Sequence, residues 1–282
     1  MERDTLINVA SELLAPQFIL FNLSFVYIGM LFSPVQSSRL LILITLAFIS
    51  ARSAGVIMNR YIGRPFDLKN PKKAGMPSMR ISRTTLILLF AALSAVFVFS
   101  AFLLNTMALA LSPVVLVMLV IDPFSKRYSS KRHYALGLIQ GFDVMGGYIG
   151  AAGAFPTNIA LYLLMFAIIF IGGGFDAIYS ITHVRSDMRN GLKTFASTKG
   201  VKKALAYSLY SHVTAVLFIM AFALVSRNLI ILAGSVAASA VLLAQHSDIN
   251  LDSDREIFAR VVKYNTAVAI ILASSVATAF FA

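Results

Sequence analysis

Long apolar runs alternate with short polar segments along the whole chain. A helix that crosses a bilayer needs about 20 largely apolar residues, and each run approaches or exceeds that length. The pattern therefore predicts an all-α, polytopic membrane protein that forms one transmembrane domain over residues 1–282. The nine spans that it predicts lie near residues 13–33, 39–58, 85–104, 106–121, 135–154, 158–178, 204–225, 228–246 and 262–282.

Basic residues gather in four of the connecting loops. The loops after the second, fourth, sixth and eighth runs hold 20 of the 24 Lys and Arg residues, whereas the opposite loops hold only Arg39 and Arg227. Lys and Arg accumulate in cytoplasmic loops, so we expect the N-terminus and these four loops in the cytoplasm and the C-terminus outside. The basic residues are Arg60, Arg64, Lys69, Lys72, Lys73, Arg80 and Arg83, then Lys126, Arg127, Lys131 and Arg132, then Arg185, Arg189, Lys193, Lys199, Lys202 and Lys203, and last Arg255, Arg260 and Lys263.

Composition supports the membrane assignment. Apolar residues make up 59% of the chain and charged residues 13%, against about a quarter charged in soluble proteins. The net charge of +12 follows from the basic loops, which also attract anionic lipid, so no nucleic-acid partner is predicted. The chain has no Cys, which excludes a disulfide or thiolate site. The opening "MERDTLINVASELLAPQ" lacks the basic start of a signal peptide, so we expect no cleaved segment.

Two of the predicted helices carry polar stripes at their cytoplasmic ends. Asn59 and Asp67 are eight residues apart after the second run, and Asp176, Tyr179, His183 and Asp187 follow the sixth at offsets 0, 3, 7 and 11. On a continuous helix each set lines one face. Ionisable groups at membrane depth are costly and usually face a bundle interior or a wet cavity. We therefore expect both stripes to border one site, although a helix end wetted by headgroups would explain either alone.

The residue types of the stripes indicate the chemistry. Carboxylate and amide oxygens are the ligands that Mg²⁺ prefers, and Mg²⁺ commonly reaches a protein through one or two carboxylates plus phosphate oxygens of the substrate. The basic residues around the stripes could hold the remaining phosphate charge. An apolar cavity between helices would accept a lipid-like tail. The sequence therefore predicts a site for an isoprenoid diphosphate.

The same residues resemble the UbiA superfamily of intramembrane aromatic prenyltransferases. That family carries N-x-x-x-D-x-x-x-D after the second helix and D-x-x-Y-x-x-x-D-x-x-x-D after the sixth. The stretch "ARSAGVIMNRYIGRPFDLKNPKKAG" is similar to the form in the 4-hydroxybenzoate and menaquinone branches. Further resemblance lies in "FSKRYSSKRHYALGLIQG" before the fifth helix, in "FNLSFVYIG" of the first helix and in Asn265 of the last.

The resemblance implies about nine helices around a central cavity and a Mg²⁺-dependent transfer of a prenyl group from an isoprenoid diphosphate to a small aromatic acceptor of the quinone-precursor type. The catalytic residues that it implies are Asp67, Asp176, Asp187 and Tyr179, and the metal ligands are Asn59, Asp67, Asp176 and Asp187. The expected diphosphate-binding residues are Arg60, Arg64, Lys72, Lys73, Lys126, Arg127 and Lys193. Asp143, inside the fifth run, lies either near the acceptor or beside a neighbouring helix as a buried partner.

Two positions depart from the family pattern, and they keep other functions open. Gly63 and His183 stand where each motif has its middle Asp, and neutral His is a poor ligand for Mg²⁺. A catalytically degenerate paralogue that binds isoprenoid lipid or a partner is therefore an alternative. A transporter with an acid and His relay fits less well, because the polar groups cluster on one side and transporter sites lie near the midplane.

Overall fold

Each predicted span corresponds to one long helix in the computed structural model of the protein, which describes residues 11–14, 16–70, 74–130, 132–247, 249 and 253–282, without the side chains of Gln17 and Lys126. Within that part of the chain, nine helices have 16 or more residues. They are α2 (Pro16–Leu31), α3 (Ser38–Asp67), α4 (Arg83–Leu104), α5 (Thr106–Tyr128), α6 (Arg132–Ala152), α7 (Ile159–Tyr179), α10 (Val201–Ser226), α11 (Leu229–Ala244) and α12 (Asp254–Phe281). Four short elements join them: η1 (Pro77–Arg80), η2 (Ser180–His183), α8 (Val184–Arg189) and α9 (Phe195–Lys199).

Six helices are long and apolar enough to cross a membrane by length and composition: α3, α4, α5, α10, α12 and the segment that starts with α7. The apolar helices α2 and α11 are shorter. The remaining long helix, α6, carries Gln140 and Asp143 in its middle, which lowers its hydropathy. The structure confirms the predicted all-α membrane fold. The predicted number of nine spans is approximate.

Short polar side chains begin most of the long helices. Ser37, Ser82 and Asn105 each accept a hydrogen bond from a backbone N–H in the first turn of the helix that follows. Asn158 and Asn228 do the same for α7 and α11. These caps satisfy backbone donors that have no partner within the helix, and this explains why the helices begin where the apolar runs begin.

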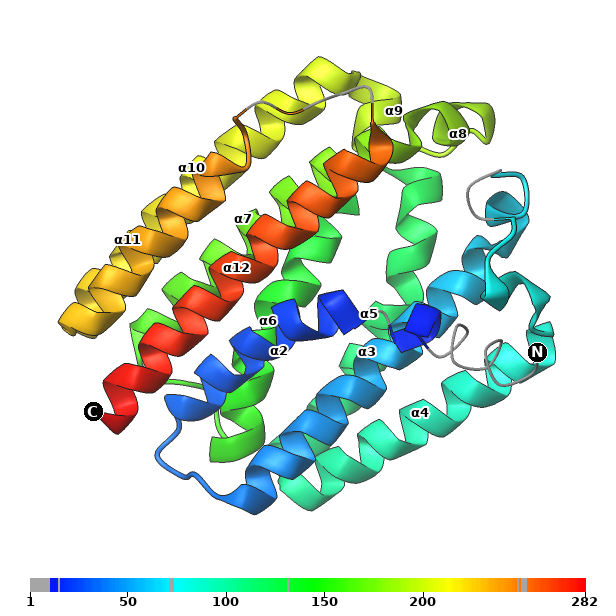
Figure 1. Ribbon diagram of the computed structural model, residues 1–282. Helices are drawn as coiled ribbons and strands as arrows, with labels where there is room; N and C mark the ends of the chain where they lie inside the picture. Colours follow the sequence, from blue (N-terminus) through cyan, green and yellow to red (C-terminus); the bar gives the residue numbers. More distant parts are fainter. Residues whose placement is uncertain (1–10, 15, 71–73, 131, 248, 250–252) are drawn as a thin grey trace.

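The long helices form two groups that pack side by side (Figure 1). Neighbouring helices close a ring in the order α2, α6, α7, α10, α11 and α12, and the main hydrophobic core lies among them. The second group contains α3, α4 and α5, and it meets the ring mainly through α5 and α6. The ring and the second group share one end at which the polar stripes lie.

Glycines permit the closest crossing in the ring. A Cβ added to Gly29 of α2 would lie 1.9 Å from the carbonyl oxygen of Val144, and one added to Gly147 of α6 would lie 1.9 Å from that of Val26. In lipid, helices associate through close packing and not through the hydrophobic effect. Small residues such as these let two helix backbones approach closely. This contact fixes α6, which carries polar residues toward the interior.

Candidate functional site

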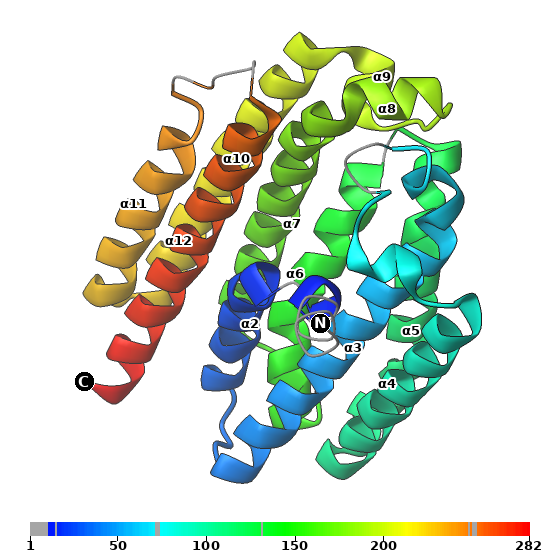
Figure 2. The same ribbon diagram turned by 45° about the vertical axis from the view of Figure 1, so that its right-hand side comes forward.

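The polar helix ends lie at the same end of the bundle. The C-terminal ends of α3, α5 and α7 and the start of α6 meet there, with α8 and α9 beside them (Figure 1, Figure 2). The end of α11 and the start of α12 lie at this end as well, while the C-terminus of the chain lies at the other. The basic loops of the sequence analysis therefore share one end of the molecule.

The end of α3 presents a buried carboxylate. The α3 helix continues nine residues beyond the predicted span, so Asn59 and Asp67 both lie on it. Asp67 is 6% exposed and pairs with Arg60, whose Nη1 lies 3.6 Å from Oδ2. A Cβ added to Gly63 would lie 3.2 Å from Asp67 Oδ2 and 3.7 Å from Asn59 Oδ1. The two predicted ligands thus flank position 63, as their spacing predicts.

A second carboxylate from the N-terminal segment also holds Arg60. Glu12 lies 3.2 Å from the Nε of Arg60 and accepts hydrogen bonds from the backbone N–H and the hydroxyl of Ser78. Glu12 therefore ties the chain before α2 to the turn after α3. It leaves Arg60 between two anions, Glu12 and Asp67.

The end of α7 presents the other buried carboxylate. Asp176 is 5% exposed, and its Oδ1 accepts a 2.6 Å hydrogen bond from Arg132 at the start of α6. Arg132 also donates to Asp122 of α5 at 3.2 Å. One guanidinium thus connects α5, α6 and α7 at the site.

The second polar stripe does not lie on one continuous helix. The α7 helix ends at Tyr179, a 3₁₀ turn covers residues 180–183, and α8 carries Asp187. The hydroxyls of Ser180 and Thr182 donate to carbonyls three residues earlier, and such bonds compete with regular helix. His183 still reaches Tyr179, with Nε2 3.1 Å from the hydroxyl. Asp187 is buried and accepts a 2.9 Å hydrogen bond from Thr194.

Tyr179 lies where the two helix ends meet. Its hydroxyl is within electrostatic reach of Arg60 and Asp67 from α3, of Asp176 from its own helix and of Arg132 from α6. The charges of two carboxylates and two guanidinium groups therefore act on one phenol. This arrangement could accept an anion on the arginines or a cation on the carboxylates.

The other basic residues of the predicted site have different positions. Arg64 donates to the carbonyls of Ile81 and Met79 at 2.5 and 2.7 Å, and so holds the turn after α3. Arg127 donates to the carbonyl of Ile62 at 2.7 Å and lies over the rings of two phenylalanines. Lys193 is exposed. Lys72, Lys73 and the side chain of Lys126 lie outside the described residues. Diphosphate binding by these residues stays a prediction.

Three charged residues at the site were absent from the predicted set. Asp122, Arg132 and Glu12 were not assigned to it, although Arg132 had been counted as a marker of topology. Asp122 gave a usable signal, because a lone acid directly after an apolar run is costly unless it has a partner. The partner itself could not be read from the sequence, since it lies on another helix.

The donor set at the site fits a hard divalent cation. Asn59, Asp67 and Asp176 offer an amide oxygen and two carboxylates, which are oxygen donors of the kind Mg²⁺ takes. Within the described part of the chain, no three Asp, Glu or His side chains form a ready metal cluster. Arg60 and Arg132 now neutralise Asp67 and Asp176. A metal would therefore compete with these arginines for the carboxylates, unless an anion binds the arginines at the same time.

Below the charged groups, the ring of Phe175 stacks with that of Tyr179 at a centroid distance of 5.9 Å. Phe175 also lines a pocket between α2, α6, α7 and α12. On the side of α3, Arg52 lies with its guanidinium 5.7 Å from the ring centre of Phe18, another residue of that pocket. Arg52 is within electrostatic reach of Asp143, which supports the interpretation of Asp143 as a buried partner.

Comparisons with known proteins agree with this architecture. Residues 22–275 match the family model of the UbiA prenyltransferase family. A 4-hydroxybenzoate octaprenyltransferase of Photobacterium profundum is 30% identical over 57% of this chain, and the match spans 56% of its own length. The same enzyme name applies to a relative from an Azoarcus species, 26% identical over 74% of this chain and 73% of the relative. The chain thus matches somewhat more than half of the length of several curated relatives.

Solved structures give the same fold. The apo structure of a UbiA homologue from Aeropyrum pernix superposes with a TM-score of 0.82 at 29% identity, over 93% of this chain and 97% of that one. A UbiA homologue from Archaeoglobus fulgidus bound to GPP and Mg²⁺ superposes with a TM-score of 0.73 at 15% identity, over 96% and 99% of the two chains. This chain belongs to the UbiA prenyltransferase family.

Proposed function

We propose that the protein transfers a prenyl group from an isoprenoid diphosphate to a small aromatic acceptor in a Mg²⁺-dependent reaction. The observation that carries the proposal is the meeting of Asp67 and Asp176 with Arg60 and Arg132 around Tyr179, directly above a pocket lined by aromatic rings. A diphosphate needs cations and metal ligands, whereas its tail needs apolar walls. Both kinds of surface occur here on adjacent turns of α7.

The residues divide between the metal and the diphosphate. Asn59, Asp67, Asp176 and Asp187 would hold Mg²⁺, which when bound would offset negative charge on the departing diphosphate. Arg60 and Arg132 would exchange their carboxylate partners for phosphate oxygens, because both guanidinium groups already lie beside the proposed ligands. Arg64 and Arg127 would have to leave their carbonyl partners to bind phosphate, and Lys72, Lys73, Lys126 and Lys193 stay predicted clamps.

Tyr179 would act at the boundary between the charged groups and the pocket. Its hydroxyl is within electrostatic reach of charged groups on both helix ends, and its ring stacks on Phe175. Aromatic faces attract cations, so these rings suit the allylic cation that forms when the bond to diphosphate breaks. Positive charge fixed near the diphosphate would stabilise the leaving group in a site that excludes water.

An aromatic acid fits as the acceptor. Two relatives carry the name 4-hydroxybenzoate octaprenyltransferase, and this chain has a half-buried arginine, Arg52, beside the aromatic pocket. The Nε of Arg52 has no hydrogen-bond partner among the described residues. A guanidinium whose buried N–H has no partner suits a carboxylate. Membrane lipid would surround the helices, and nothing in the proposal involves nucleic acid.

The sidedness of the molecule is also a proposal. The end that carries the site would face the cytoplasm together with the N-terminus, because it bears the basic loops. Since the chain has no Cys, single cysteines can be introduced at Lys193 near the site and at Arg227 on the opposite end. Impermeant thiol reagent added outside intact cells should label position 227 and spare position 193. The reverse pattern would show that the orientation is inverted.

A binding protein without turnover is the second candidate. Gly63 and His183 remove two carboxylates from the family motifs, and this favours a site that binds isoprenoid diphosphate and does not ionise it. Such a protein would keep the arginines and the pocket. The two candidates therefore differ in the release of diphosphate and agree on binding.

The test uses the full chain in lipid nanodiscs with geranyl diphosphate and 4-hydroxybenzoate, with and without Mg²⁺. We expect Mg²⁺-dependent diphosphate release and prenylated product, both reduced about a hundredfold or more in Asp67→Asn and Asp176→Asn. Glu256→Gln, an exposed acid at the same end of the bundle, is the control and should leave the rate unchanged. Binding of geranyl diphosphate without any release would support the binding protein and refute the transferase.

A further inference from the structure

Two carboxylates from different parts of the chain hold Arg60. Its Nε lies 3.2 Å from Oε1 of Glu12, and its Nη1 lies 3.6 Å from Oδ2 of Asp67. The closer partner is therefore Glu12, which precedes α2 and belongs to neither polar stripe. The contact with Asp67 is well beyond the roughly 2.7–2.9 Å of a strong charge-assisted hydrogen bond, so a ligand can replace it more easily.

The carboxylate of Glu12 has a fixed position. Its Oε2 accepts a 2.9 Å hydrogen bond from the backbone N–H of Ser78, and its Oε1 accepts one from the Ser78 hydroxyl. Ser78 is fully buried in η1. The next residue along the chain, Leu13, is buried against Ile57 and Leu86. Polar and apolar contacts thus place the carboxylate beside the arginine before any ligand binds.

The turn that carries Ser78 is held from the side of α3 as well. Arg64 donates hydrogen bonds to two backbone carbonyls at this turn. Arg60 and Arg64 are four residues apart, about one turn of the same helix. Arg64 thus fixes the turn, Ser78 of the turn fixes Glu12, and Glu12 faces Arg60. The position of the Glu12 carboxylate is therefore set relative to α3 itself.

The two arginines of the site are held in different ways. Arg132 donates through Nη1 to Asp176 and through Nη2 to Asp122, so carboxylates occupy both of its terminal nitrogens. Arg60 meets Glu12 with its Nε, and its terminal nitrogens donate no hydrogen bond to the residues that the structure describes. The two Nη groups form a fork that can bind phosphate oxygens in a bidentate manner. Glu12 therefore occupies the Nε and leaves the fork to other partners.

A carboxylate beside an anion site has two opposite effects on anion binding. Glu12 repels the charge of a diphosphate bound to Arg60, so charge alone predicts that removing the carboxylate would strengthen binding. A long side chain that is already held in place loses less conformational entropy when a ligand binds, so positioning predicts that the same removal would weaken binding. Because the two effects differ in sign, a binding measurement separates them.

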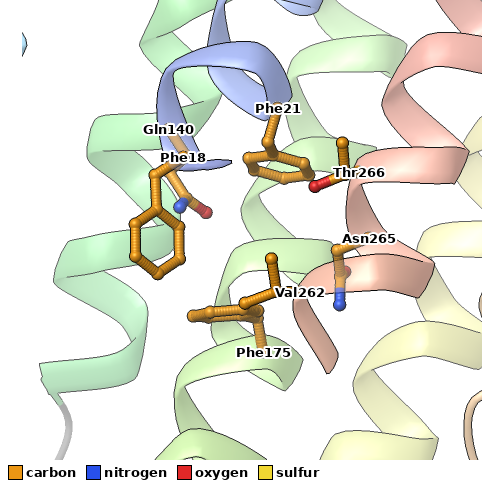
Figure 3. Close-up of a pocket in the computed structure, with 7 residues that line it drawn as sticks. All are labelled: Phe18, Phe21, Gln140, Phe175, Val262, Asn265 and Thr266. Atoms are coloured by element: carbon orange, nitrogen blue, oxygen red, sulfur yellow. The ribbon is translucent and has the colours of Figure 1, made fainter. Parts of the chain in front are cut away.

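We infer that Glu12 is a positioning residue for Arg60, whose Nη groups it keeps available to the diphosphate while the metal takes Asp67. This inference rests on the proposed binding of an isoprenoid diphosphate, and it applies to a transferase and to a binding protein alike. Glu12 precedes α2, whose Phe18 and Phe21 line the aromatic pocket (Figure 3). The same contact therefore links the helix that lines the pocket to the end that binds diphosphate.

The test is a double-mutant cycle on the dissociation constant of geranyl diphosphate with Mg²⁺, measured for the full chain in nanodiscs. Glu12→Gln should weaken binding at least about tenfold, because glutamine can still accept a hydrogen bond from Ser78 but offers Arg60 no charge. In an Arg60→Met background the same substitution should change the constant less than about twofold, since no guanidinium is left to position. Glu256→Gln, an exposed acid, controls for the loss of one negative charge and should leave the constant unchanged.

The outcomes separate this inference from the proposed function. Tighter or unchanged binding by Glu12→Gln, or equal weakening with and without Arg60, would overturn the inference while the proposed function stands. In the last case Glu12 would only tie the chain to the turn. A wild type that binds no geranyl diphosphate would refute the proposed function, and the inference with it. If Glu12→Gln does not fold, Glu12→Asp, which is one methylene shorter, takes its place in the cycle and the same outcomes decide.

Discussion

Replacing Arg132 with methionine removes the cation between two largely buried carboxylates. Arg132 lies 2.6 Å from Asp176 and 3.2 Å from Asp122, and the three side chains are 15%, 7% and 12% exposed. An exposed ion pair contributes about 0.2–1 kcal/mol, whereas breaking a buried one costs about 3–5 kcal/mol. Since some water reaches Arg132, we expect a loss near the lower limit, about 3 kcal/mol. For a chain of this size that corresponds to a fall in Tm of roughly 6–12 °C.

Thermal unfolding of the purified protein in detergent measures this loss. Arg185→Met, on the exposed face of α8, is the control for the removal of one positive charge and should change Tm little. Adding Asp122→Asn to Arg132→Met should recover part of the loss, because one of the two unpaired charges is removed. A Tm for Arg132→Met no lower than that of the control would refute the description of Arg132 as the cation that holds the helix ends together.

Three further predictions concern the motif, the pH dependence and the helix crossing. Gly63→Asp combined with His183→Asp should raise the rate of prenyl transfer, since position 63 already faces both α3 ligands; an unchanged rate in a folded variant would favour the binding protein. Burial and the nearby Arg260 lower the pKa of His246 to about 4. The native state therefore binds fewer protons than the unfolded state, so Tm should fall as the pH drops from about 6.5 to 4, and less so in His246→Gln. Gly147→Ala should lower Tm strongly, because its Cβ would meet a backbone carbonyl at 1.9 Å, whereas Gly146→Ala, with nothing within 4 Å, should not.

The apolar runs predicted the helices because a span is a local property of the sequence. The predicted run 39–58 ended too early, since hydropathy falls at Asn59 while the helix continues to Asp67. Hydropathy marks where the membrane would end, and backbone hydrogen bonds decide where the helix ends. The same distinction explains why the stripe from Asp176 to Asp187 was predicted as one helix and contains a 3₁₀ turn.

The partners of the charged side chains could not be predicted from the sequence. Spacing placed Asn59 and Asp67 on one face, which the space around Gly63 confirms. It could not place Arg132 between Asp122 and Asp176, because those contacts depend on how α5, α6 and α7 pack. The pocket could not be predicted for the same reason, although Asn265 had been noted in the family resemblance, because its walls come from four helices.

We propose that the ends of α3 and α7 together hold one metal ion and the diphosphate. This proposal is tested most directly by an experimental structure with geranyl diphosphate and Mn²⁺, whose anomalous scattering locates the metal. We expect the metal on Asp67 of α3 and Asp176 of α7, with diphosphate oxygens on Arg60 and Arg132. Metal and diphosphate bound by residues of only one of the two helices, or at another end of the bundle, would contradict it.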